Sequence, residues 1–364
     1  MAQPARSEHP YHMHEAILAQ PEAFAESIQR NTQALEQVAE RLAACRQLYL
    51  VGIGTSYHAA QVGAHLLRAY APETPVAAIN AYDFALYGPR LLPADAVLVV
   101  SHRGNKRYSL AALQRAHEAG CFTMLLTGAG ETAETGAAEV ALRTTANERS
   151  SAHTISYSTG IGVLAALAQR LGASQTGAED LPPAYLTETL PALLREALTT
   201  EPQVESLARA YAARRRIWLA GGGPSAVTAQ EIALKIKESS YMQAEGMSTE
   251  TMLHGPFQCV EAEDLFCLIA PAGPAQERTR TLAGQARAIG AAVLVVSDST
   301  SLVSLDDGVQ MSAVPAAPEP FTALTCLIPL QLFSYHLALA RGTNPDGFRL
   351  EDPRFAQARQ MVQL

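Results

Sequence analysis

The 364-residue sequence has little lysine, no paired cysteines and no long apolar run, and each scarcity excludes something. Lys106, Lys235 and Lys237 are the only lysines among 27 basic residues, so arginine supplies nearly every surface cation and each lysine becomes a candidate for a specific role. The five cysteines form no CxxC pair and lie mostly in apolar segments, which is typical of buried free thiols in a reducing compartment. No apolar run approaches the roughly 18 residues that span a bilayer.

The N-terminal segment and the net charge narrow the class of protein further. No apolar stretch near the start is bounded like a signal peptide, so we expect a cytoplasmic protein with no membrane partner. The net charge of −8 disfavours nucleic acid as a partner but permits a local cationic pocket for an anionic metabolite. His9, His12 and His14 form a near-terminal run, which we expect to be solvated, and we predict no metal and no other cofactor.

The sequence repeats one strand–turn–helix unit. Residues 46–69 are typical of a short buried strand, a glycine turn and a helix, and residues 215–238 follow the same order. Apolar strands alternating with helices predict parallel sheets that are covered on both faces, with ligand sites at the carboxyl ends of the strands. We therefore predict an α/β fold of two doubly wound parallel-sheet domains, flavodoxin-like three-layer sandwiches related by duplication. Further strands are expected at 96–100, 123–128, 265–271 and 292–298.

The remaining segments complete the predicted organisation. The first 45 residues are expected to form one or two amphipathic helices, and long apolar helices are expected near 154–170 and 321–341. The predicted parts are a helical arm over 1–45, a first domain over 46–178, a helical linker over 179–206, a second domain over 207–343 and a tail over 344–364.

Three glycine-bearing turns follow predicted strands, at 52–56, 101–105 and 221–225. Glycine lets the backbone approach a ligand, and the helix that follows supplies free N–H donors that favour an anion such as phosphate. Each turn alone is a weak signal, because a glycine after a strand is often only a turn. The second turn, in SHRGNKR, is unusual because it carries the cations Arg103, Lys106 and Arg107.

The segment 231–256 contains the richest set of reactive side chains. On a helix, Glu231, Lys235 and Glu238 fall on one face, and the Gly-Pro pair after His254 predicts a turn. A carboxylate base and a histidine acid can move a proton between adjacent sugar carbons and open a sugar ring. The alternative is that Glu231 and Lys235 form an ordinary surface pair, worth roughly 0.2–0.5 kcal/mol.

Taken together, several motifs resemble a known family. The chain is similar to tandem SIS (sugar isomerase) domain proteins, and specifically to the isomerase half of glucosamine-6-phosphate synthase, the glutamine:fructose-6-phosphate aminotransferase. The motifs that carry the resemblance are MHEAILAQPEAF, GIGTSYHAA, VVSHRGN, NERSSAHT, ALKIKESSYMQAEG with LHGP, and IPLQLFSYHLALARGTNPD.

The resemblance implies a homodimer that binds a sugar phosphate at a site shared between subunits. It implies that Glu238 shuttles the C1/C2 proton, that Lys235 assists at the sugar oxygens, and that His254 of a second copy opens the ring. Lys237 has no catalytic counterpart. The residues implied to bind the substrate are Thr55, Ser56, Ser101, His102, Arg103, Gly104, Asn105, Lys106 and Ser151.

The sequence departs from the family pattern in three places. The family's phosphate loop is serine, glutamine, serine, glycine, glutamate and threonine, so Arg103 and Lys106 replace two hydroxyl residues. The synthase forms a Schiff base through a tail lysine, whereas this tail has none and Ala358 stands about where that lysine would be. The glutaminase half and its cysteine nucleophile are also lacking, since Ala2 follows the initiator methionine, so no glutaminase activity is expected.

Two classes of function remain open from the sequence. The leading hypothesis is an enzyme of the phosphosugar isomerase or aminotransferase-like type that acts on a sugar phosphate or amino-sugar phosphate, by isomerisation, deamination or deglycation. The alternative is a non-catalytic sugar-phosphate-binding regulator. A helix-turn-helix module often accompanies such regulators, and the arm is too short to hold one comfortably.

Overall fold

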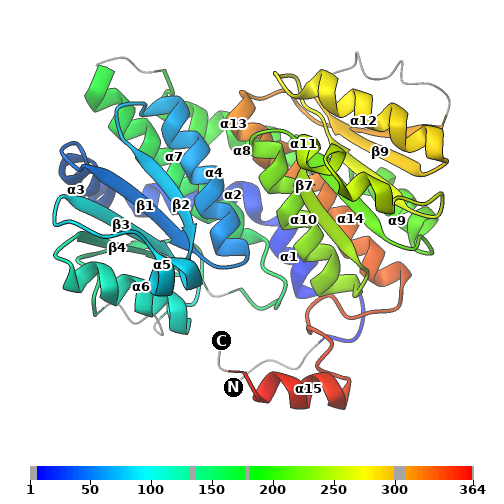
Figure 1. The fold of residues 1–364 in the computed structure, drawn as a ribbon, viewed down its shortest axis with the longest axis horizontal. Coiled ribbons are helices and arrows are strands. Elements are labelled where there is room, and N and C mark those ends of the chain that lie inside the picture. The colour runs from blue at the N-terminus through cyan, green and yellow to red at the C-terminus, as the bar shows by residue number, and fades with distance from the viewer. Residues whose placement is uncertain (1–5, 131–135, 147, 177–179, 299–307, 363–364) are drawn as a thin grey trace. The chain divides into compact units, whose positions relative to one another are not determined.

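The computed structural model describes residues 6–130, 136–146, 148–176, 180–298 and 308–362. The chain divides into two compact units, and each contains one five-stranded parallel sheet (Figure 1). The β1–β5 unit comprises Ala19–Glu148 and Ile155–Pro191. The β6–β10 unit comprises the residues up to Leu18, Arg149–Thr154 and Ala192–Met361.

The sheet of the β1–β5 unit has the strand order β2-β1-β3-β4-β5. Its central strands carry the continuous apolar runs that the sequence shows, and β3 and β4 are buried along their whole length. The register places Val51 of β1 opposite Ile79 of β2 and Val99 of β3. The strands are β1 (Gln47–Gly52), β2 (Val76–Asn80), β3 (Asp95–Val100), β4 (Phe122–Thr127) and β5 (Val140–Arg143).

Helices cover both faces of this sheet. Phe84 and Leu113, from α5 and α6, pack with Val51 and Val99 on one face, and α4 and α7 pack against each other on the other (Figure 1). The helices of the unit are α2 (Gln20–Arg30), α3 (Thr32–Leu42), α4 (Thr55–Tyr70), α5 (Ala81–Tyr87), α6 (Arg107–Glu118), α7 (Ile155–Thr176) and the π-helical turn η1 (Tyr185–Thr189).

The β6–β10 unit repeats this architecture. Its sheet has the order β10-β9-β8-β6-β7, which equals the first order read backwards when β6 is matched to β1. Trp218 and Phe266 lie in a core cluster with Leu282 of α12 on one face. On the other face α10 packs against α13 and α14.

The strands and helices of the β6–β10 unit have the following bounds. The strands are β6 (Ile217–Gly221), β7 (Ala244–Ser248), β8 (Leu265–Ile269), β9 (Ala292–Ser297) and β10 (Val309–Ala313). The helices are α1 (His12–Leu18), α9 (Glu201–Tyr211), α10 (Pro224–Ser240), α11 (Thr249–Leu253), η2 (Pro256–Cys259), α12 (Gln276–Ile289), α13 (Glu319–Thr325), α14 (Leu327–Ala340) and α15 (Pro353–Gln360), and α8 (Leu190–Leu198) precedes α9.

The predicted fold class of two doubly wound parallel sheets is confirmed. The sequence did not reveal β2, β5, β7 or β10, and each of these is an edge strand. Edge strands are only partly buried, as the intermediate exposure of all five residues of β2 shows, so they lack the continuous apolar run that marks a central strand.

The predicted helical arm differs from the structure. It holds three helices rather than one or two, because Asn31 interrupts the chain between α2 and α3. The buried side-chain amide of Asn31 donates to the carbonyl oxygen of Arg143 at 2.6 Å, and the Asn31 amide oxygen accepts from the N–H of Arg143 at 2.8 Å. These two hydrogen bonds fix edge strand β5. The arm also divides, since α1 belongs to the β6–β10 unit and α2 to the β1–β5 unit. Ala2 and the boundary expected at 178–179 lie outside the described residues.

One stretch among the described residues, Glu319–Ala340, is long and apolar enough to cross a membrane by length and composition. The prediction that no apolar run approaches the length of a membrane span is therefore wrong for this stretch. In the structure 89% of its most apolar 18-residue window is buried, as in the core helix of a domain.

Candidate functional site

One group of predicted site residues lies at one edge of the β1–β5 sheet. Strands β1 and β3 are parallel neighbours, so Gly52 and Val100 end them at the same edge. The helices that follow pass to opposite faces, since α4 packs on α7 whereas α6 packs on α5. A strand pair whose connections diverge in this way opens a crevice at the carboxyl ends of the strands, where doubly wound proteins bind ligands.

The turn after β1 is built for a close backbone approach. A Cβ on Gly52 would lie 2.4 Å from the carbonyl oxygen of Ser56, so only glycine fits at this position. Gly54 adopts a positive φ of 57° and precedes α4. Thr55 and Ser56 then occupy the first turn of α4, where the helix presents N–H groups that have no partner within the helix. The predicted phosphate contacts of these two residues therefore have a suitable local structure.

The loop after β3 contains a buried serine hydroxyl. The backbone N–H of Ser101 donates to Leu126 at 2.9 Å, and Gly104, with a φ of 62°, donates back to Ser101 at 3.0 Å. Among the described residues the Ser101 Oγ has no hydrogen-bond partner, and neither does the Oγ of Ser109 in the first turn of α6. A buried hydroxyl without a partner costs about 1–3 kcal/mol, which a bound ligand could offset. Sequence reasoning missed Ser109, although its place four residues after the loop turn could have marked it.

His102 has a different role from the other loop residues. Its imidazole is buried, and its Nε2 accepts a hydrogen bond from the backbone N–H of Glu148 at 3.0 Å. Burial and the charge of Arg103 lower the pKa of His102 to about 4, so the ring is neutral near pH 7. The side chain of His102 thus ties the loop to the segment before α7, and its carbonyl oxygen accepts from the N–H of Gly128 at 2.8 Å and from the Thr127 hydroxyl at 3.1 Å.

The cations of the loop differ in exposure. Arg103 and Arg107 are exposed, and the guanidinium of Arg107 lies 5.4 Å from the ring centre of Tyr108. Lys106 is half-buried at the N-cap of α6, and Asn105 is exposed. The loop therefore has an exposed arginine, Arg103, just before Gly104 and a half-buried lysine, Lys106, at the start of α6. An anion at this helix end would meet positive charge as well as backbone N–H groups.

A second group of predicted site residues is on α10 of the β6–β10 unit. Lys235 is buried, and its Nζ lies 2.5 Å from Glu238 Oε2 and 3.6 Å from Glu231 Oε1. The alternative of an ordinary surface pair is wrong, because the side chains of Glu231 and Lys235 are no more than 1% exposed. The side chain of Glu238 is 20% exposed, so its carboxylate combines a buried cationic partner with access from outside.

The position of α10 is fixed by close packing. A Cβ on Gly246 of β7 would lie 2.1 Å from the carbonyl oxygen of Ala229, so the helix rests directly on the strand backbone. At the other end the Ser239 hydroxyl donates to the carbonyl oxygen of Ser334 at 3.2 Å, which joins α10 to α14. These contacts hold the ion pair of Lys235 and Glu238 on a rigid element rather than on a loop.

His254 lies at the end of α11, before Gly255 with its φ of 133°, as the predicted turn requires. Its side chain is 73% exposed, and its Nε2 lies 2.9 Å from Glu250 Oε1. Glu250 also accepts two hydrogen bonds from Arg278, and these together with His254 lower the pKa of Glu250 to about 2. His254 is therefore presented outward on its own chain.

Ser151 and Ala358 complete the list of predicted positions. Ser151 lies in the short segment that belongs to the β6–β10 unit, and its N–H donates to the carbonyl oxygen of Asp346 at 3.1 Å. The Asp346 carboxylate in turn accepts from the backbone N–H groups of His12 and Met13, both at 2.9 Å. Ala358 is exposed on α15.

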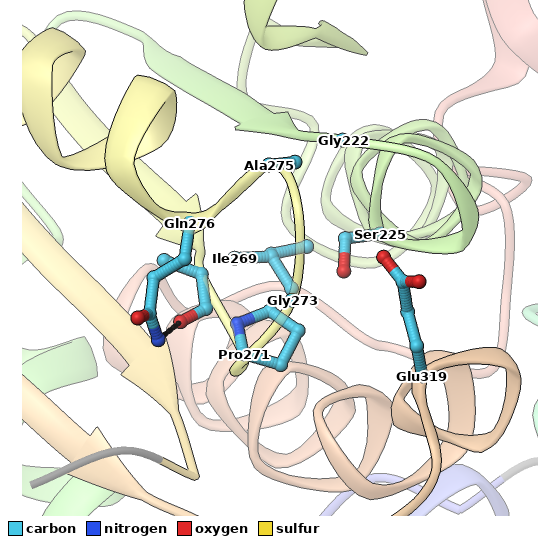
Figure 2. Close-up of a pocket in the computed structure, with 9 residues that line it drawn as sticks. Gly222, Ser225, Ile269, Pro271, Gly273, Ala275, Gln276 and Glu319 are labelled. Atoms are coloured by element: carbon cyan, nitrogen blue, oxygen red, sulfur yellow. Dashed lines mark hydrogen bonds between the residues drawn. The ribbon is translucent and has the colours of Figure 1, made fainter.

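The β6–β10 unit has a hollow at the position that corresponds to the carboxyl ends of β1 and β3. The hollow lies where β6 and β8 end and α10 begins (Figure 2). The Glu319 side chain points into it, and its Oε1 lies 3.1 Å from where a Cβ of Gly273 would be. A carboxylate beside the N-terminus of α10 occupies the place of an anion and would repel phosphate. The β6–β10 unit thus has the same glycine turn and helix N-terminus as the β1–β5 unit, but the Glu319 carboxylate occupies the position where an anion would bind.

The expectation that the N-terminal histidines are solvated is wrong for His14. Its side chain is buried, and its Nε2 lies 2.6 Å from Glu201 Oε1. Glu201 is on α9, so spacing along the sequence could not reveal this contact. His9 is exposed, and His12 contacts Glu15 at 3.4 Å.

Comparisons with known proteins agree with this architecture. Residues 41–170 and 210–341 each match the SIS domain family. A glutamine–fructose-6-phosphate aminotransferase (isomerizing) of Thermococcus kodakarensis is 32% identical over 93% of this chain, and the chain spans 56% of that relative's length. The C-terminal domain of glucosamine-fructose-6-phosphate aminotransferase from Francisella tularensis superposes with a TM-score of 0.85 at 22% identity, over 94% of this chain and 99% of that one. Tagatose-6-phosphate ketose/aldose isomerase from Escherichia coli superposes with a TM-score of 0.79 at 20% identity, over 96% and 98%.

Proposed function

We propose that this chain, which belongs to the SIS domain family, binds a sugar phosphate or amino-sugar phosphate and catalyses proton transfer between C1 and C2 of the sugar. The reaction is an aldose/ketose isomerisation, or a deamination or deglycation that passes through the same proton transfer. The observation that carries the proposal is the buried ion pair of Lys235 with a partly exposed Glu238 on a rigid helix.

The phosphate group is assigned to the β1–β5 unit. Two glycine turns end at the N-termini of α4 and α6. The buried hydroxyl of Ser101, which has no partner among the residues that the structure describes, supports a ligand at this edge. The equivalent corner of the β6–β10 unit holds the Glu319 carboxylate, which favours one phosphate per chain rather than two. Arg103 and Lys106 favour a more strongly charged group than a family member with hydroxyl residues there would bind.

The proton transfer is assigned to Glu238. In the open-chain aldose its carboxylate removes the proton from C2, and the electron pair forms the C1–C2 double bond of an enediolate as the C1 carbonyl opens. A proton passes from the C2 hydroxyl to O1, and Glu238 returns its proton to C1 to give the ketose. Lys235 holds the carboxylate in place and donates a hydrogen bond toward it, so it is a positioning residue in the free protein and can turn to a sugar oxygen when substrate binds. His254 is exposed, which supports its use by a second copy of the chain in a homodimer, where it opens the sugar ring.

Nitrogen transfer from a tail imine is not part of the proposal. The tail residue that stands about where the synthase's lysine would be is Ala358, and α15 around it carries no lysine. A Schiff base needs a primary amine, so a keto sugar cannot be held in that way by this helix.

The Glu238→Gln variant tests the proposal, with Lys237→Ala as the matched control on the same helix. Glutamine keeps the shape of the side chain but cannot accept the proton, so turnover of a hexose or hexosamine phosphate should fall by about 10²–10⁴-fold. Substrate affinity, measured by calorimetry, should change little. Lys237 is exposed and its replacement should leave both quantities unchanged.

Equal turnover in Glu238→Gln and the unaltered protein would show that this carboxylate does not move the proton. If the protein binds sugar phosphates tightly but converts none of them, the chain is a binding regulator rather than an enzyme.

A further inference from the structure

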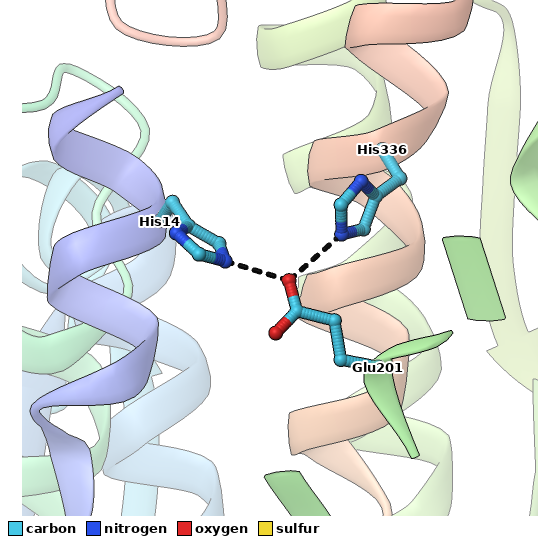
Figure 3. A group of neighbouring side chains, drawn as sticks. All are labelled: His14, Glu201 and His336. Atoms are coloured by element: carbon cyan, nitrogen blue, oxygen red, sulfur yellow. Dashed lines mark hydrogen bonds and ion pairs between the residues drawn. The ribbon is translucent and has the colours of Figure 1, made fainter. Parts of the chain in front are cut away.

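Three side chains outside the proposed catalytic group converge between helices of the β6–β10 unit. His14 is on α1, Glu201 is the first residue of α9, and His336 is on α14 (Figure 3). The Nε2 atoms of His14 and His336 lie 2.6 Å and 2.9 Å from the same carboxylate oxygen, Glu201 Oε1. The three ligand atoms all lie within 4.8 Å of one another.

Burial within this His–Glu–His cluster favours the neutral form of His336. His14 is 9% exposed and His336 is 5% exposed, and burial lowers the pKa of His336. The titratable groups that face His336 are Glu201, Glu205 and His14. The two carboxylates lie on α9 and raise the pKa of His336, but burial has the larger effect and the net shift is downward. Burial raises the pKa of Glu201, but hydrogen bonds from His336 and His14 outweigh it, and the net shift is downward. Neutral imidazole and ionised carboxylate are the forms that bind a metal ion.

Neighbouring rings restrict how the cluster can move. Tyr335 stacks on His14, with ring centres 4.9 Å apart and an interplanar angle of 25°. The Tyr335 hydroxyl lies 2.7 Å from His9 Nδ1, and the ring of His9 is 5.0 Å from that of His14. The Glu201 side chain keeps 24% of its surface exposed, which leaves a path for an ion from solvent. A site of this kind combines a preformed donor set with access.

We propose that His14, Glu201 and His336 bind a divalent transition-metal ion of the zinc type. Two imidazole nitrogens and one carboxylate oxygen are a common zinc donor set, with distances of about 2.0–2.2 Å and a fourth position left for water. In the metal-free cluster both Nε2 atoms face the Glu201 carboxylate as hydrogen-bond donors. Metal binding requires the other tautomer, in which Nδ1 carries the proton and the Nε2 lone pair faces the ion. The ion ties α1 to α9 and α14 within one unit, which gives it a stabilising role. The proposal uses none of the residues assigned to proton transfer.

A hydrogen-bonded trio without metal is the competing explanation, and the Glu201→Gln variant separates the two. The amide oxygen of glutamine can still accept from both imidazoles, so the trio survives, but the anionic metal ligand is lost. Untagged full-length protein, stripped with a chelator, would be titrated with Zn²⁺ by calorimetry alongside Glu201→Gln and His336→Gln. His117→Gln, an exposed histidine on α6, is the matched control.

We expect one Zn²⁺ per chain in the unaltered protein and in His117→Gln. Loss of a direct ligand in Glu201→Gln or His336→Gln should weaken binding by more than the about 10–100-fold that loss of an outer hydrogen-bond partner costs. Zinc should raise the melting temperature of the unaltered protein but not of Glu201→Gln. Visible absorption of bound Co²⁺ should report a low coordination number in the unaltered protein only.

Either of two results would overturn the site. One is the absence of stoichiometric Zn²⁺ binding to the folded, unaltered protein. The other is Zn²⁺ binding of the same stoichiometry and affinity in Glu201→Gln and His336→Gln, which would place the ion elsewhere. Circular dichroism of each variant checks that a loss of binding is not a loss of fold.

Discussion

Lys235 shows what a single residue's sequence context can and cannot reveal. The scarcity of lysine singled it out, and helical spacing placed it with Glu231 and Glu238 on one face. Spacing does not say whether that face is buried, because a surface pair and a buried pair have the same period. In the structure α10 packs against β7 and α14, and the Lys235 ammonium is buried beside two carboxylates. Removing one partner of such a group leaves an uncompensated buried charge.

His102 carries a prediction about pH and stability. Its pKa is about 4 in the folded protein and 6.5 as the ordinary value, so the unfolded chain binds a proton more readily between these limits. The stability that the neutral buried ring contributes is complete above pH 6.5 and is lost as the pH falls toward 4, by about 3 kcal/mol in all. His102→Gln keeps an acceptor for the Glu148 N–H but does not titrate.

The measurement is urea unfolding of both proteins from pH 7 to pH 4. The unaltered protein should lose more stability over this range than His102→Gln, because the carboxylates of the two proteins titrate alike. Equal loss in both would show that the folded His102 titrates near its ordinary pKa.

At the scale of elements, the predictable part of the fold was the part buried on both faces. The runs 96–100 and 292–298 are apolar at consecutive positions, which is typical of a strand that is buried on both faces, so the sequence predicts the central strands β3 and β9. Edge strands such as β2 and β10 owe their place to pairing with a neighbour, and a half-exposed five-residue segment gives no periodic signal of its own. The break between α2 and α3 likewise depends on Asn31 meeting β5, a contact 112 residues away in sequence.

Two glycine substitutions test the turn that ends β1. Gly52→Ala places a Cβ 2.4 Å from the backbone oxygen of Ser56, so α4 must shift, and overpacking of this kind costs about 1–3 kcal/mol. Gly284→Ala, in the exposed middle of α12, meets nothing within 4 Å and should stabilise by about 0.5–1 kcal/mol.

Urea midpoints of the two variants should therefore move in opposite directions. Gly52→Ala should also bind sugar phosphates more weakly, because Thr55 and Ser56 move with the start of α4. An unchanged midpoint and unchanged affinity in Gly52→Ala would mean that this turn is not a tight scaffold for a ligand.

At the scale of the whole chain, the duplication could be predicted from the sequence, but the different roles proposed for its two units could not. Both sheets have the same strand order, and both place a glycine turn and a helix N-terminus at the same corner. Only the structure shows that one corner holds a serine hydroxyl with no partner in the described part of the chain and that the other holds the Glu319 carboxylate. Glu319 reaches its corner from a helix far along the chain. The contact of His14 with Glu201 escaped sequence reasoning for the same reason.

The central claim is that the chain moves a proton at C2 of a phosphorylated sugar. The most direct measurement is proton NMR of hexose 6-phosphates and hexosamine 6-phosphates incubated with the protein in D₂O. We predict that the C2 proton signal of at least one of these sugars disappears as deuterium enters from solvent, and that Glu238→Gln abolishes this exchange while Lys237→Ala retains it. Tight binding of a sugar phosphate without C2 exchange in the unaltered protein, or exchange that persists in Glu238→Gln, would contradict the account.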